Sequence, residues 1–131
     1  MHFPENLELL HRAEEELREK SVALVRRDIH RQQHLGVVEC TMDMLDLLRQ
    51  HPTQEEDFKV VQMLALRTFN SFASSAALLL RGYYQTSALI MRDVLETAFL
   101  LNLFHSDRAA ITRWRTCTPK ERRKTFGPVE V

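Results

Sequence analysis

The fold is decided by residues 69–105, FNSFASSAALLLRGYYQTSALIMRDVLETAFLLNLFH. This stretch is apolar almost throughout and contains one glycine, Gly82. Glycine accepts the left-handed backbone conformation that commonly ends a helix. A helix that is apolar on most of its circumference has to be covered by other helices. We therefore predict an antiparallel hairpin of two central helices, from about residue 52 to 80 and from about residue 83 to 105.

Upstream of the hairpin, the sequence predicts two further helices, at residues 4–34 and 37–50, separated by Gly36. The first is highly charged apart from one narrow stripe of leucines, which is typical of a surface helix with one buried face. The second is expected to turn its apolar residues toward the hairpin. The stripe of the first helix is Leu7, Leu10, Leu17 and Leu24, and the inward residues of the second are Val37, Cys40, Met44, Leu47 and Leu48.

Downstream of the hairpin, Ser106 and Asp107 are residue types that favour a helix N-cap, and they predict a short helix to about Cys117. Residues 118–121, Thr-Pro-Lys-Glu, have the spacing of a capping box. Residues 125–131 show no periodicity and predict an irregular tail, or the start of a further element. The sequence thus predicts an all-α protein whose single domain, residues 1–124, is an antiparallel bundle of four main helices plus a short C-terminal helix.

The 131 residues are sufficient to form a hydrophobic core without disulfides or metals. Cys40 and Cys117 are far apart in sequence, which favours free thiols in a reducing compartment. The longest apolar windows, residues 72–80 and 97–104, are shorter than the roughly 20 residues that span a bilayer. We therefore expect a soluble cytoplasmic protein that requires no cofactor and does not bind a membrane.

The charges inside the apolar stretch form the first candidate site. Arg92 and Glu96 are four residues apart, so their side chains share one face of a helix and can form an ion pair. Their apolar neighbours, including Leu95 and Phe99, predict that this pair is buried. A buried pair either fixes helix register or, with Arg67 added, orients a small anionic ligand through the planar guanidinium groups.

Two histidines form a second candidate site. His30 and His34 lie four residues apart, a spacing that places two imidazoles on one helix face as in many helical metal sites. A metal site needs at least a third ligand, and the sequence has no HExxH motif. Solvated histidines are therefore the expected state, with a metal site as the alternative.

A basic stretch near the C-terminus forms a third candidate site. Basic side chains neutralise phosphates, and an exposed indole can stack on a base, so this stretch predicts weak binding of single-stranded nucleic acid. The alternative is that the tryptophan packs against the bundle while the arginines are solvated. The candidate contacts are Arg113, Trp114, Arg115, Arg122, Arg123 and Lys124.

The chain resembles a set of uncharacterised bacterial all-helical proteins along residues 79–88, LLRGYYQTSA, and the helix that follows. Those proteins share a Gly-Tyr turn followed by a helix with Ala, Arg and Glu at steps of four. Some of those proteins are similar to HEPN (higher eukaryotes and prokaryotes nucleotide-binding) bundles, many of which are RNases in phage-defence and toxin–antitoxin systems. The resemblance covers about residues 65–104. It rests on Gly82, Tyr83, Ala88, Arg92 and Glu96.

The resemblance implies an RNA-binding protein or an RNase. HEPN nucleases use an Arg and a His, separated by about four to six residues, on a helix near the C-terminus. This chain departs from that pattern, because its last histidine, His105, has no arginine at that spacing. Arg27 and His34 have the spacing, but they lie on the predicted first helix.

The distribution of charge favours self-association. The chain is neutral overall, but residues 1–60 carry a net charge of −5 and residues 61–131 a net charge of +5. Opposite patches can pair between copies, and four helices leave part of the apolar hairpin uncovered. We therefore expect a homodimeric interaction or oligomerisation module without catalytic activity, with the HEPN-like RNA-binding protein or RNase as the alternative.

Overall fold

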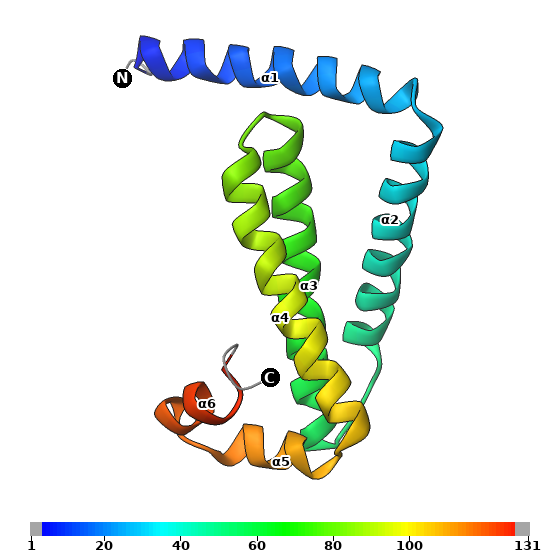
Figure 1. The fold of residues 1–131 in the computed structure, drawn as a ribbon, viewed down its shortest axis with the longest axis vertical. Helices are drawn as coiled ribbons and strands as arrows, with labels where there is room; N and C mark the ends of the chain where they lie inside the picture. Colours follow the sequence, from blue (N-terminus) through cyan, green and yellow to red (C-terminus); the bar gives the residue numbers. More distant parts are fainter. Residues whose placement is uncertain (1–3, 128–131) are drawn as a thin grey trace.

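The computed structural model describes residues 4–127, and its six elements are all α-helices. Four long helices pack together and two short helices follow, so the predicted fold class is confirmed. Figure 1 shows their arrangement. The helices are α1 (Glu5–Arg26), α2 (Ile29–Gln50), α3 (Glu56–Leu80), α4 (Tyr84–Ser106), α5 (Ala109–Thr116) and α6 (Pro119–Thr125).

The predicted hairpin is formed by α3 and α4, which share the most extensive contact in the molecule. Gly82 has φ +89°. Its N–H donates to the Leu79 carbonyl at 3.2 Å and the Tyr83 N–H donates to the Leu78 carbonyl at 2.9 Å, which is the paired bonding of a Schellman C-cap. Two small buried hydroxyls, Ser75 and Ser87, bond each other at 2.8 Å and let the two helices approach closely.

Replacing Gly82 by Ala is expected to destabilise the fold by about 2 kcal/mol, because L-residues pay about 1–2 kcal/mol for left-handed backbone. A Cβ atom at this position would also lie 2.5 Å from Leu17 Cδ2, which then has to move. Gly36→Ala is the matched control, since no atom beyond its chain neighbours and its own helix backbone lies within 4 Å of its Cβ position, and Ala is favoured inside a helix. Urea unfolding should show opposite signs for the two variants, and equal midpoints would contradict this account of the turn.

The boundary between the first two helices differs from the prediction. The chain bends at Arg27 and Asp28, and Gly36 lies inside α2. The Asp28 carboxylate caps α2 by accepting from the N–H groups of His30 at 3.0 Å and Arg31 at 3.2 Å. An Asp cap starts a helix without any Gly or Pro, and for this reason the sequence pattern reads as continuous across it.

A smaller difference concerns the start of α3. The helix begins at Glu56, so Pro52 lies in the preceding loop and not in the first helical turn. The Thr53 hydroxyl accepts from the Glu55 N–H at 3.1 Å and shapes this loop. Downstream, Thr118 and Glu121 form the predicted capping box. The cap predicted for the preceding helix differs: Arg108 stands at the N-cap of α5 without a side-chain cap bond, and Asp107 accepts from the Ala109 N–H at 3.0 Å in the turn before it.

The helix α1 does not run alongside the other three long helices. It crosses the tip of the α3–α4 hairpin, while α2 descends along α3 (Figure 1). The Tyr83 hydroxyl donates to the Glu14 carboxylate at 2.5 Å and holds the Glu14 pKa below its usual value. No residue of α1 is buried, so this crossing leaves most of its leucine stripe in solvent.

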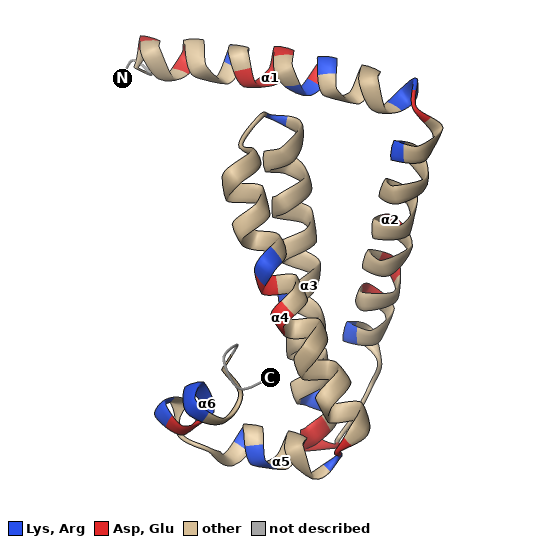
Figure 2. Ribbon diagram, viewed as in Figure 1, with Lys and Arg blue, Asp and Glu red and all other residues tan. Residues whose placement is uncertain are grey.

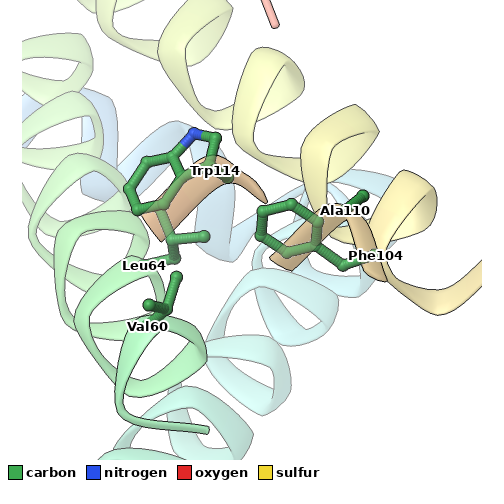
Figure 3. Close-up of a cluster of buried hydrophobic side chains, with 5 residues drawn as sticks. All are labelled: Val60, Leu64, Phe104, Ala110 and Trp114. Carbon is green, nitrogen blue, oxygen red and sulfur yellow. The ribbon is translucent and has the colours of Figure 1, made fainter. Parts of the chain in front are cut away.

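The hydrophobic core is small and is formed where α3, α4 and α5 meet (Figure 3). Phe104 and Trp114 meet edge to face, with ring centroids 6.2 Å apart. Phe126, in the predicted irregular tail, packs against this cluster, and Thr125 is still helical. The rest of that tail, residues 128–131, lies outside the described residues. The core cluster is Val60, Leu64, Phe104, Ala110 and Trp114.

Two predictions about the core are wrong. In α2, Val37, Met44 and Leu47 face solvent with 66%, 70% and 71% of their surface exposed, although they were expected to face the hairpin. In α4, Leu95 and Phe99 are 57% and 60% exposed. Both helices carry apolar residues around most of their circumference, and the face toward α3 is taken by other side chains.

Candidate functional site

The Arg92–Glu96 ion pair forms, but it is not buried. Arg92 Nε lies 2.9 Å from Glu96 Oε1, and the two side chains are 68% and 41% exposed. The prediction of burial is wrong because the neighbours Leu95 and Phe99 are themselves uncovered. An exposed pair of this kind contributes only about 0–1 kcal/mol.

Arg67 does not join this pair. Its guanidinium binds Asp93 with two hydrogen bonds, one of them from Nε to Oδ2 at 3.1 Å, and so ties α3 to α4. The Ser71 hydroxyl also donates to Asp93 at 3.3 Å. These residues line a shallow cavity of about 540 Å³ whose guanidinium and carboxylate neutralise each other. Local spacing does not reveal the role of Asp93, because its contact with Arg67 joins residues that are 26 positions apart.

The basic C-terminal stretch is largely engaged within the chain. Arg113 pairs with Asp107 at 2.6 Å, and Arg115 pairs with Asp57 at 2.9 Å. Hydrogen bonds from Thr112 and Arg115 lower the pKa of Asp57. These pairs fasten α5 to the start of α3 and to the end of α4, so two of the predicted nucleic-acid contacts have structural partners.

Trp114 is 8% exposed and belongs to the core, which removes it from the predicted nucleic-acid contacts. The Arg122 guanidinium lies 4.1 Å from the Trp114 ring centroid, and its Nε donates to the Trp114 carbonyl at 3.1 Å. Arg123 donates to the Pro119 carbonyl at 3.4 Å, and Lys124 is exposed. The indole face therefore stacks on an arginine of its own chain.

His30 and His34 lie on the first turns of α2 and are exposed, whereas the sequence placed them on the first helix. Within residues 4–127, no group of three or more His, Cys, Asp or Glu side chains is arranged to hold a metal ion. The Arg27–His34 pair of the HEPN comparison is divided between the interhelix bend and α2.

A largely apolar groove lies at a place where the sequence predicts no site. It has a volume of about 510 Å³ and lies between α2 and α4, with α3 as its floor. Hydrogen-bonding groups are few along it, and Arg92 lies at its edge. The lining residues are Leu35 and Val38 of α2, Phe72, Ser75, Ala76 and Leu79 of α3, and Tyr84, Ser87, Ala88, Met91, Arg92 and Leu95 of α4.

A second apolar surface runs along α2. Residues 29, 37, 40, 44 and 47 recur at steps of three, four and eight, so they share one face of the helix. Its large members, Ile29, Val37, Met44 and Leu47, are all exposed. Figure 2 shows that most of α3 and α4 carries few charges, whereas charges are frequent on α1 and occur on α2, at the start of α3, at the middle of α4 and on α5–α6.

By length and composition alone, α3 is apolar enough to cross a membrane. The central helix of a water-soluble bundle can meet the same criteria, but such a helix is mostly buried, whereas only 22% of the apolar window of α3 is buried here. The expectation of a cytoplasmic protein that does not bind a membrane stays a prediction.

Comparison with known proteins gives no match: no family model, no curated protein and no solved structure is similar to this chain. The resemblance to HEPN-like proteins therefore stays a prediction. Most of the charged candidate residues form ion pairs within the chain, whereas the large apolar side chains on the long helices are exposed.

Proposed function

We propose that this chain is an interaction module that associates with a second copy of itself and acts by association, without catalysis. The observation that carries the proposal is the accessible surface, 10057 Å². A compact monomer of 15.4 kDa is expected to expose about 7,200 Å². The chain therefore exposes about 2,900 Å² more than a compact monomer of its mass.

This excess is comparable with the surface lost in a stable dimer. A standard interface removes about 800 Å² from each partner, and large obligate homodimers remove about 2,500 Å² or more from each. The excess is also of the right chemical kind, because the exposed residues include large apolar side chains on each of the four long helices. Soluble monomers rarely expose contiguous apolar patches larger than a few hundred Å².

The proposal predicts that the thermal midpoint rises with protein concentration, because association stabilises only the folded state. Sedimentation from low micromolar concentration upward should show a species of twice the 15.4 kDa chain mass. Gly36→Ala, which is distant from other side chains, provides a control for changes in intrinsic stability. A single monomeric species and a constant midpoint across this range would contradict self-association.

A further inference from the structure

The groove has the geometry of an unoccupied position in a four-helix bundle. Both α2 and α4 run antiparallel to α3, and each packs against it. In an up-down-up-down bundle, a fourth helix lies between such a pair, diagonally across from α3 and antiparallel to both neighbours. That position is the groove, because α1 instead crosses the tip of the hairpin (Figure 1).

The helix α1 has the properties of the missing fourth helix. Leu10, Leu17 and Leu24 recur at heptad spacing with Leu7 beside them, and all four remain exposed. With a rise of about 1.5 Å per residue, this stripe is about 26 Å long. The exposed side of α4 from Tyr84 to Phe99 is about 23 Å long by the same rise per residue, so the leucine stripe of α1 and the exposed side of α4 have similar lengths.

The bend between α1 and α2 allows a different arrangement. It consists of Arg27 and Asp28 and contains neither Gly nor Pro, so the sequence also permits one continuous helix through this point. A straight α1–α2 helix carries α1 away from its own hairpin. When two such chains meet head to head, α1 of each chain lies beside the α3–α4 hairpin of the other chain. In that position α1 runs antiparallel to α2 and α4 of the other chain.

We propose that the groove between α2 and α4 binds α1 of a second copy, so that two chains exchange their first helices when the Arg27–Asp28 bend straightens. This inference rests on the proposed self-association. It names the groove as the contact surface and α1 of the second copy as the helix that binds there. Exchange of an identical element is a low-cost route to a dimer, because each contact reproduces one that a closed bundle would make. It covers the leucine stripe and the groove together.

Ile29→Pro distinguishes this exchange from other modes of association. Position 29 is the first residue of α2, where proline is favoured, and Asp28 already has the extended backbone that a following proline requires (φ −124°, ψ 106°). A proline inside a straight helix, in contrast, removes a hydrogen bond and clashes with the preceding turn. Ile29→Ala is the matched control, because it removes the same 61% exposed side chain without constraining the backbone.

Sedimentation equilibrium on the intact chain measures the outcome. We expect Ile29→Pro to raise the dimer dissociation constant by about a hundredfold, with unchanged helical circular dichroism, while Ile29→Ala stays close to wild type. A dimer of unchanged affinity in Ile29→Pro would overturn helix exchange and leave self-association standing. A wild-type chain that is monomeric would instead overturn the proposed function itself.

Cross-linking provides a second measurement that does not depend on the bend. In a Cys40→Ser/Cys117→Ser background, chains carrying Leu10→Cys and chains carrying Leu95→Cys are refolded together and oxidised. Exchange predicts a disulfide between the two different chains, and Met63→Cys on the outer face of α3 replaces Leu95→Cys as the control. Absence of the mixed disulfide, or equal yields with Met63→Cys, would overturn α1 as the occupant.

Discussion

Replacing Leu64 by Asp is expected to unfold the chain. Leu64 is 1% exposed and lies in the small core beside Trp114, so the new carboxylate would have neither water nor a partner. An unpaired buried charge costs several kcal/mol, against a total stability of about 5–15 kcal/mol for a domain. Circular dichroism at 25 °C should show loss of most helical signal and no cooperative thermal transition.

Leu66→Asp is the matched control for this experiment. It makes the same chemical change two residues further along α3, at a side chain that is exposed. We expect this variant to keep its helical signal and a cooperative transition. A thermal midpoint for Leu64→Asp within a few degrees of wild type would mean that the core does not lie where α3, α4 and α5 meet.

Leu95→Asp is expected to leave the chain folded and to abolish its association. The sequence predicts burial around Leu95 and the neighbouring Arg92–Glu96 pair, but the Leu95 side chain is exposed and lines the groove. In the monomer the carboxylate faces water, whereas an occupant of the groove would bury it. Burial without a partner costs several kcal/mol, which weakens a dimer by about a hundredfold or more. Sedimentation at a concentration where the wild type is dimeric measures this effect.

Leu89→Asp separates the groove from α4 as a whole. Leu89 lies on the same helix and is exposed, but it does not line the groove. We expect Leu89→Asp to associate like the wild type. Loss of association in both variants would assign the interface to α4 without distinguishing the groove, and retention in both would exclude the groove as the contact surface.

The ion pairs illustrate how far local spacing predicts a site. The Arg92–Glu96 contact follows from four-residue spacing on one helix, and the structure contains it. Its burial depended on what covers α4, which spacing does not encode. The Arg67–Asp93 and Arg115–Asp57 pairs join residues that are 26 and 58 positions apart, so only the packing of α3 against α4 and α5 brings them together.

By itself, the sequence determined the all-α class, the Gly82 turn and the Thr118–Glu121 capping box, because each depends on a few neighbouring residues and on backbone hydrogen bonds. The tertiary structure alone decided which apolar face each helix buries, that Trp114 enters the core, and that α1 crosses the hairpin tip and leaves a groove open. The reason is physical. A helix that is apolar around most of its surface has several faces of similar hydrophobicity, and the choice among them follows from how the whole set of helices packs together.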